Sequence, residues 1–284
     1  MEKETKLIKR VAAVHDLCGY GNCSLGIALP VLSACGLDAL PAATAVLSTH
    51  TAFATYTFQD LTDSLEQTIA HWKEIGFNID GVYSGFLGSA RQIDILHQFF
   101  EESKGRRLIV LDPVMADHGR IYKTYTPEMC AGMAELARFA DILTPNMTEA
   151  AVLLNEQYTG QHAEAKETRA LCERLLSLGS RRVVLKGIER DDGRVYNAVI
   201  TQEGEYYESW NKQSSVSLHG TGDLFASIVT GLVMQDKSLP DAVEFAGHFV
   251  YDAIMLSKTQ PGHKARGVSF EPLLGEIARF ALGA

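Results

Sequence analysis

Short runs of β-forming residues alternate with longer amphipathic, helix-forming stretches through most of this chain. Such alternation is typical of βαβ units, because neighbouring parallel strands need a long crossover connection that usually contains a helix. We therefore expect an α/β fold with a central, mostly parallel β-sheet flanked by helices. The expected strands are Val11–Val14, Ala42–Leu47, Gly81–Ser84, Leu108–Leu111, Asp141–Leu143 and Arg182–Leu185. The expected helices are Ser24–Cys35, Leu61–Ile75, Ala90–Ser103, Pro127–Phe139 and Glu164–Leu178.

The pattern changes after Lys186. Two β-rich segments, Arg194–Thr201 and Glu205–Trp210, flank a turn at Gly204 and predict a β-hairpin. No repeat, low-complexity segment or linker interrupts the chain, so we expect one domain over residues 1–284 without a large separate lid domain. Further helical patterns cover residues 221–236, 240–257 and 271–282.

Composition narrows the class of function. The 284 residues carry a net charge of −9 at pH 7, which disfavours general binding to nucleic acids or anionic membranes. The five cysteines form no CxxC pair, and no stretch reaches the length of a membrane span. We therefore expect a cytoplasmic protein with reduced thiols, in which Cys23 and Cys35 belong to the core.

Polar or glycine-rich residues follow six expected strands at the point where each strand ends. In an open parallel sheet, ligands bind at the carboxyl ends of the strands, so these segments form the candidate site. An acidic protein that binds phosphates there needs a local positive charge or a cation. The segments are 15–22, 48–51, 85–88, 112–117, 144–149 and 186–187.

The segment HGTGDLFASI, residues 219–228, places two glycines, a threonine and an aspartate where a helix is expected to begin. One interpretation is a turn in which Asp223 merely caps the helix. The other is an anion cradle, since N-terminal N–H groups and the helix dipole favour a phosphate and glycines allow close approach. In the second interpretation Asp223 is a general base for a substrate hydroxyl.

Three carboxylates predict a metal site. Asp112 and Asp117 follow an apolar strand, and Glu149 lies at the start of a helix. Carboxylates near phosphates hold Mg²⁺, largely through water, and Thr144 and Asn146 add further oxygen atoms. The alternative is that the first carboxylate only ends a strand and the last only occupies a first helical turn.

Other side chains at the strand ends suit a nucleotide and an aromatic substrate. Lys186 can reach a nucleotide phosphate, with an ordinary solvated lysine as the alternative. His15, His50, Tyr20 and Phe86 can shape an aromatic pocket, although a structural role is the alternative for either histidine.

Six motifs together resemble the ribokinase superfamily and, within it, the bacterial branch of the pyridoxal and pyridoxamine kinases. The resemblance runs almost from end to end, and the order and spacing of the motifs are far more specific than any one motif. The motifs are GYGN (19–22), LSTHT (47–51), YSGFLGS (83–89), DPVMAD (112–117), TPNMTEA (144–150) and GTGDLFAS (220–227).

The resemblance implies phosphoryl transfer from ATP to the 5′-hydroxymethyl group of pyridoxal, pyridoxine or pyridoxamine. It also implies Mg²⁺, a monovalent cation such as K⁺, and a homodimer. Asp223 is then the catalytic base, and the amides of residues 220–222 form the anion hole. The candidate site therefore comprises Asp223, Gly220, Thr221 and Gly222 for catalysis; Asp16, Tyr20, His50, Thr51 and Phe86 for the substrate; Thr144, Asn146, Glu149, Lys186, Thr221 and Gly222 for ATP; and Asp112, Asp117 and Glu149 for the metal.

The sequence departs from the common pyridoxal kinase pattern at two places. An early serine is missing, and Asp16 is the best match for its position. Lys186 stands where many pyridoxal kinases carry Thr or Ser, and in this it resembles the hydroxymethylpyrimidine kinases of thiamine synthesis. A hydroxymethylpyrimidine kinase and a non-catalytic vitamer-binding protein on the same fold therefore remain as alternatives.

Overall fold

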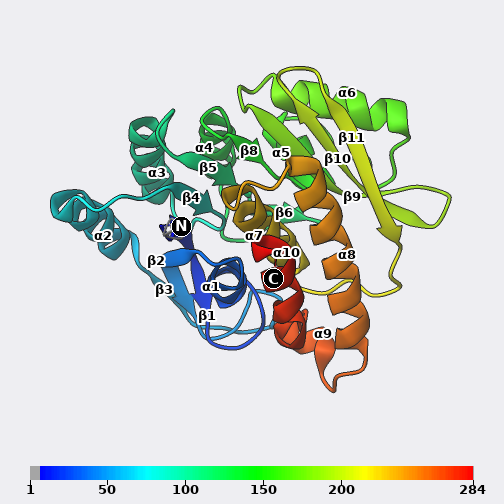
Figure 1. Cartoon of the computed structure of the whole chain (residues 1–284), viewed down its shortest axis with the longest axis horizontal. Helices are drawn as coiled ribbons and strands as arrows, with labels where there is room; N and C mark the ends of the chain where they lie inside the picture. Colours follow the sequence, from blue (N-terminus) through cyan, green and yellow to red (C-terminus); the bar gives the residue numbers. More distant parts are fainter. Residues whose placement is uncertain (1–6, 284) are drawn as a thin grey trace, which may run out of the picture.

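Nine strands form the main sheet of the computed structural model, which describes residues 7–283 (Figure 1). The strands are β1 (Arg10–Cys18), β2 (Asp38–Leu47), β3 (Phe58–Asp60), β4 (Gly81–Ser84), β5 (Leu108–Leu111), β8 (Ile142–Leu143), β9 (Arg182–Glu189), β10 (Arg194–Thr201) and β11 (Tyr206–Lys212). Their order across the sheet is β11-β10-β9-β8-β5-β4-β1-β2-β3. The six strands from β9 to β2 pair in parallel, whereas β3, β10 and β11 are antiparallel at the edges. The expected α/β fold is confirmed.

Helices cover both faces of this sheet (Figure 1). The helices are α1 (Leu25–Ala34), α2 (Thr62–Ile75), α3 (Ala90–Ser103), α4 (Pro127–Ala137), α5 (Met147–Leu153), α6 (Ala165–Leu176), α7 (Thr221–Met234), α8 (Leu239–Lys258), α9 (His263–Arg266) and α10 (Leu274–Leu282). Helices α2 to α6 contribute to the core on one face, and α1, α7, α8 and α10 to the core on the other. Along β1, Val11 and Ala13 belong to the second core while Ala12 and Val14 belong to the first, because successive strand residues point to opposite faces.

Most expected elements are present, and the short ones were missed. The β10–β11 hairpin turns at Gly204, whose φ of +86° suits glycine. The helix expected to begin at Glu149 is present as α5, whereas β3 and a two-stranded sheet formed by β6 (Ala116–Asp117) and β7 (Arg120–Ile121) were not expected. Elements of two or three residues are too short to show a hydrophobic period, which explains these omissions.

Strand β1 lies at the centre of the parallel sheet, between β4 and β2. The chain leaves β1 in one direction to form β2 and returns to the other side of β1 to form β4. Such a reversal of strand order separates the connections at the carboxyl ends and leaves a crevice between them. The candidate site residues therefore gather at this end of the sheet. Among the described residues, no helix has the length and apolar character needed to cross a lipid bilayer.

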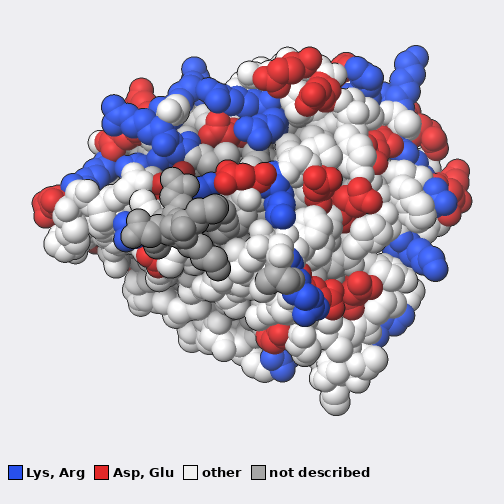
Figure 2. Space-filling view, viewed as in Figure 1, with Lys and Arg blue, Asp and Glu red and all other residues white. Residues whose placement is uncertain are grey.

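Lys and Arg are interspersed with Asp and Glu over the upper part of the face shown in Figure 2. Exposed side chains of the described residues form ion pairs, such as Lys9 with Asp236 at 2.9 Å and Arg138 with Glu135 at 2.9 Å. Exposed pairs of this kind contribute little to stability, because water and salt screen them. The two apolar cores therefore dominate the stability of the fold.

The contact between α1 and α7 depends on a glycine. A Cβ atom on Gly231 would lie 2.4 Å from the Sγ atom of Cys35, a fully buried residue. We predict that Gly231→Ala lowers the free energy of unfolding by about 1–3 kcal/mol through overpacking. Gly26→Ala is the matched control, because a Cβ there meets no atom within 4 Å and alanine favours a helix by about 1 kcal/mol. Urea unfolding of both variants checks this, and equal shifts would contradict it.

Candidate active site

A cavity of about 460 Å³ opens at the carboxyl ends of the parallel strands. Most of the predicted site residues line it, although they come from segments far apart in the sequence. Those lining it are Asp16, His50, Thr51, Phe86, Asp112, Asp117, Asn146, Glu149, Lys186, Gly220, Thr221, Gly222 and Asp223.

Three of the polar residues considered above do not line the cavity. Tyr20 is 51% exposed and contacts Phe53 edge-on at 5.9 Å between ring centroids. Thr144 lies behind the cavity wall and donates its hydroxyl to Asp112 at 3.1 Å. His15 is buried against Tyr83 at 4.3 Å between ring centroids, and burial lowers its pKa to about 3, so it is neutral.

The amino terminus of α7 faces the cavity through two glycines. Gly220 is the N-cap with a φ of +83°, and a Cβ atom there would lie 2.1 Å from the carbonyl oxygen of Asn22. A Cβ atom on Gly222 would lie 3.4 Å from Nζ of Lys186. The first N–H groups of a helix have no acceptor within the helix, so this cradle presents donors and a positive dipole end to the cavity. A negatively charged group fits there.

Asp223 lies in the first turn of α7, three residues after the cap. The interpretation that Asp223 is itself the N-cap is therefore wrong, because Gly220 holds that position. Burial, and after it the charge of Asp112, raise the pKa of Asp223 from 3.8 to about 7, although the hydrogen bond from the backbone N–H of Ser24 opposes the shift. A carboxyl group with a pKa near neutrality can accept a proton from a substrate and release it again.

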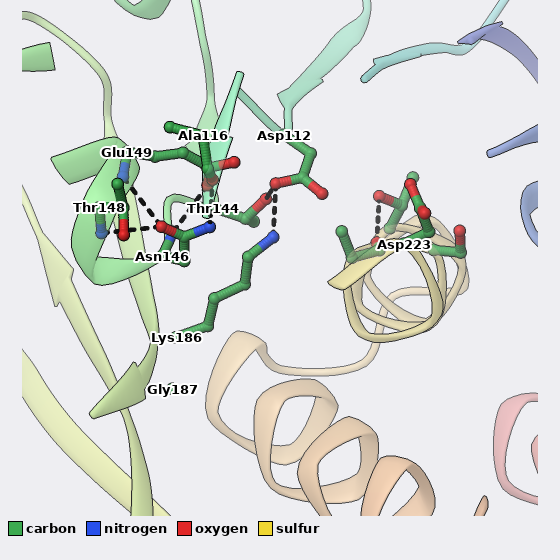
Figure 3. A network of polar contacts seen from close by, with 12 residues as sticks. Asp112, Ala116, Thr144, Asn146, Thr148, Glu149, Lys186, Gly187 and Asp223 are labelled. Carbon is green, nitrogen blue, oxygen red and sulfur yellow. Dashed lines mark hydrogen bonds and ion pairs between the residues drawn. The ribbon is translucent and has the colours of Figure 1, made fainter. Parts of the chain in front are cut away.

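Lys186 and Asp112 form a buried ion pair across the cavity floor (Figure 3). Nζ of Lys186 donates to Oδ1 of Asp112 at 2.5 Å. Burial alone lowers the pKa of Lys186, but the charges of Asp112 and Glu149 more than offset this and leave it raised. Lys186 is therefore charged, and the interpretation of an ordinary solvated lysine is wrong because this side chain is only 11% exposed.

Asn146 and Glu149 form a capping box at the start of α5 (Figure 3). The Asn146 side chain accepts from the N–H groups of Thr148 and Glu149, and Oε2 of Glu149 accepts from the N–H group of Asn146 at 2.8 Å. Nδ2 of Asn146 also donates to the carbonyl oxygen of Ala116 at 2.9 Å, which ties α5 to β6. Both residues thus have a structural role while they line the cavity.

The donors suit a hydrated cation near Asp112. Oδ2 of Asp112 is buried and has no hydrogen-bond partner among the described residues, while Oδ1 is paired with Lys186 and Thr144. Burial raises the pKa of both Asp112 and Glu149, and the charge of Asp112 also raises that of Glu149. The carboxylates of Asp112, Asp117 and Glu149 are not among the described groups whose ligand atoms lie within 4.8 Å of one another. Mg²⁺ suits such spacing, because it keeps several of its waters.

The other end of the cavity contains residues that sequence reasoning missed. His219 stacks on His50 at 4.4 Å between ring centroids, and Nε2 of His50 lies 2.8 Å from the carbonyl oxygen of Ala265. Cys23 and Cys35 are both buried hydrophobic residues, as expected, and Cys23 also lines the cavity together with Cys18. The sequence signal for Cys18 and Cys23 was their position, since Cys18 is the last residue of β1 and Cys23 follows shortly after it.

Ser24 connects the two ends of the site. Its hydroxyl hydrogen-bonds with Asp16, and its backbone N–H hydrogen-bonds with Asp223. Its φ of +51° lies in the left-handed region, which a serine rarely adopts. No sequence pattern marks this residue, because its role arises only when β1 and α7 are brought together.

A further wall of the cavity comes from β10, β11 and α8. Asn197 and Asn211 face Gly247, where a Cβ atom would lie 2.5 Å from Nδ2 of Asn211. Val250 and Ile254 of α8 provide apolar surface beside these amides. The sequence carries no motif for this wall, since the strands and the helix are far apart along the chain.

The chain is similar in sequence or in structure to several known proteins. The chain is 30% identical over 184 residues to the thiamine biosynthetic bifunctional enzyme TH1 of Arabidopsis thaliana, covering 64% of this chain and 34% of that enzyme. It is 26% identical over 259 residues to pyridoxal kinase PdxY of Pseudomonas aeruginosa, covering 86% of each chain. Among solved structures, a Bacteroides thetaiotaomicron protein named after phosphomethylpyrimidine kinase, crystallised with pyridoxal, has a TM-score of 0.91 and 34% identity over 95% of this chain and 96% of its own.

The bifunctional plant enzyme is much longer than the region it shares with this chain, since the match spans about a third of it. The model of the family described as phosphomethylpyrimidine kinase matches residues 28–269, which includes every segment that lines the cavity after β2. This chain belongs to the phosphomethylpyrimidine kinase family, whose relatives include pyridoxal kinases.

Proposed function

We propose that this protein transfers the γ-phosphoryl group of ATP to the 5′-hydroxymethyl group of a vitamin B6 vitamer. Asp223 carries this proposal, because its carboxyl group lies in the first turn of a glycine-framed helix and has a pKa of about 7. The pyridoxal in crystals of the Bacteroides relative supports the choice of substrate.

Phosphoryl transfer needs positioning and charge stabilisation more than covalent chemistry from the protein. In the proposed reaction, the first N–H groups of α7 and Nζ of Lys186 stabilise the charge on the transferred group. Asp223 accepts the proton of the hydroxymethyl oxygen as that oxygen attacks phosphorus. The Lys186–Asp112 pair at 2.5 Å holds the lysine in place before ATP arrives.

We further propose that Asp112, Asp117 and Glu149 hold Mg²⁺ largely through water, beside ATP. When bound, Mg²⁺ neutralises phosphate charge in a site that otherwise has an excess of carboxylates. The strongest support for this assignment is Oδ2 of Asp112, which is buried and has no hydrogen-bond partner among the described residues. A stimulating monovalent cation such as K⁺ and a homodimer remain part of the same proposal.

A hydroxymethylpyrimidine kinase is the second candidate function. Lys186 favours it, as does the similarity to the thiamine biosynthetic enzyme TH1. Both candidate substrates carry a hydroxymethyl group on a nitrogen heterocycle, so the same base and anion cradle serve either. The non-catalytic alternative is weaker, because Gly220, Gly222 and Asp223 are all present at the start of α7.

An activity assay identifies the substrate. The protein is incubated with Mg²⁺, K⁺ and ATP, and with pyridoxal, pyridoxine, pyridoxamine or hydroxymethylpyrimidine in separate reactions. We expect a 5′-phosphate on at least one B6 vitamer, identified by mass. Turnover of hydroxymethylpyrimidine alone would establish the second candidate. ATP-independent retention of pyridoxal without any product would instead indicate a binding protein.

The pH dependence of kcat/KM tests the role of Asp223. Because the base must be deprotonated, kcat/KM should fall about tenfold for each pH unit below the pKa of about 7 and level off above it. A profile that stays flat between pH 5 and 8 would contradict the assignment. Measurement with saturating Mg²⁺ and ATP at each pH separates this effect from loss of the nucleotide.

Asp223→Asn should separate catalysis from stability. We expect turnover to fall by about 10²- to 10⁴-fold while ATP still binds, because only the proton acceptor is lost. The raised pKa means that the folded state holds the proton more tightly than the unfolded state, so wild-type stability is lost as pH rises from about 4 to 7. At pH 8 the variant should therefore be more stable, by up to about 4 kcal/mol.

Asp63→Asn is the matched control, since Asp63 lies on the exposed surface of α2 and pairs with Arg91. It should change neither turnover nor stability beyond about 0.5 kcal/mol. Near-normal turnover in Asp223→Asn would rule out Asp223 as the base.

A further inference from the structure

Three metal-ligating side chains lie together at the end of β1, outside the proposed phosphate region. They are Asp16, Cys18 and Cys23, and one ligand atom from each lies within 4.8 Å of the other two. Sγ of Cys18 is 3.4 Å from Oδ2 of Asp16. Asp16 and Cys23 are buried and Cys18 is partly buried, and all three line the large cavity.

We propose that Asp16, Cys18 and Cys23 form a binding site for a thiophilic divalent cation such as Zn²⁺. Zn²⁺ takes thiolate sulfur at about 2.3 Å and carboxylate oxygen at about 2.0–2.2 Å with tetrahedral geometry, which places neighbouring ligand atoms about 3.5 Å apart. The observed separation of sulfur and oxygen, 3.4 Å, already matches that spacing. Because all three groups face the cavity, the fourth tetrahedral position is open to it.

The chemistry of the donors excludes Mg²⁺ from this cluster. Mg²⁺ and Ca²⁺ select oxygen ligands, whereas thiolates select Zn²⁺ and similar soft ions. The proposed Mg²⁺ position near Asp112 offers only oxygen atoms, so the two ends of the cavity differ in the metal they accept. The same protein therefore has a hard-cation region for phosphates and a soft-cation site at the end of β1.

Among residues 7–283, no positively charged side chain is among the main groups that shift the pKa of Asp16 or Cys18. The neighbouring thiol of Cys23, burial and the carboxylate of Asp16 raise the pKa of Cys18, and burial raises the pKa of Asp16. A bound divalent cation supplies the missing charge. On binding, each thiol that becomes a ligand releases its proton to the solvent, so that the ion replaces two protons without any change of oxidation state.

The second cluster of this kind among residues 7–283 is a weaker candidate. It comprises His162, Glu164 and Asp191, all exposed at the surface. Nε2 of His162 lies 3.2 Å from Asp191 and 3.7 Å from Glu164, so polar contacts between exposed surface side chains already account for it. This cluster provides a control for the buried one.

Occupation of the Asp16 cluster would compete with the substrate, and this part rests on the proposed function. Asp16 is a candidate substrate-binding residue, and His50 and Phe86 line the same end of the cavity. A metal ion and a vitamer that both use the Asp16 carboxylate cannot bind at the same time. Because coupling between two binding sites is reciprocal, the vitamer should lower the affinity for the metal by the same factor by which the metal lowers the affinity for the vitamer.

The test is titration of the reduced, metal-free full chain with Co²⁺, followed by absorption spectroscopy. Co²⁺ bound to thiolates gives a sulfur-to-metal charge-transfer band, and we expect one ion per chain with such a band that Zn²⁺ removes. Cys18→Ser and Cys23→Ser should each abolish the band or weaken Co²⁺ binding by about 10-fold or more. Protons released on addition of Zn²⁺, measured in weak buffer, should fall in both variants.

Cys130→Ser and His162→Ala are the controls. The first removes a thiol from the α4 region of the core, and the second removes the exposed cluster. Both should bind Co²⁺ with the wild-type band. Absence of a charge-transfer band in the wild type, an unchanged band in both Cys18→Ser and Cys23→Ser, or its loss in Cys130→Ser would overturn the proposal.

Pyridoxal distinguishes the metal site from the proposed function. Adding pyridoxal should lower the apparent affinity for Co²⁺ in the wild type. A band that depends on Cys18 and Cys23 but is unaffected by pyridoxal would support the metal site and contradict the overlap with the substrate. Kinase activity without any Co²⁺ binding would leave the proposed function standing and reject the metal site.

Discussion

The buried ion pair between Lys186 and Asp112 is the interaction on which the candidate site depends. It joins β9 to the end of β5 at 2.5 Å, in a region where Asp112, Glu149 and Asp223 crowd three carboxyl groups together. Without the lysine, these carboxyl groups would be buried without the positive charge of Lys186 to offset their own, which is strongly unfavourable. With it, Nζ of Lys186 lies 2.5 Å from Oδ1 of Asp112, while Asp223 keeps a pKa of about 7. The pair thus places a positive charge beside Asp112 in the same site where Asp223 is proposed to act as the base.

Glycine is the second constraint, because only residues without a side chain allow the backbone segments of the site to approach each other this closely. Gly220 must adopt a positive φ and also pass within a van der Waals contact of Asn22, and no other residue satisfies both requirements. Gly21 packs under His50 in the same way, since a Cβ atom there would lie 2.3 Å from the imidazole ring. The segments 19–22 and 220–223 are therefore positioned against each other by the absence of side chains.

Much of the fold was predictable because its signals are local. The apolar runs at β1, β4, β5 and β9 and the amphipathic helices between them were read correctly, as was the hairpin at Gly204. The edge strand β3 and the small sheet of β6 and β7 were missed, because two or three residues carry no period. For the site, placing ligands at the carboxyl ends of parallel strands was enough to select most of the lining residues, including Asp112, Lys186 and Asp223.

The sequence by itself determined the α/β class, the order of the elements and the polar segments that meet at one end of the sheet. Only the tertiary structure decided which of those residues lie in the cavity, since Tyr20 points to solvent and Thr144 lies behind the wall. It also decided that Lys186 is buried and charged, that Cys23 faces the cavity with Cys18, and that the pKa of Asp223 is near 7. The physical reason is that burial and charge at each of these atoms arise from groups distant in the chain. Such long-range contacts leave no pattern in any short window of sequence.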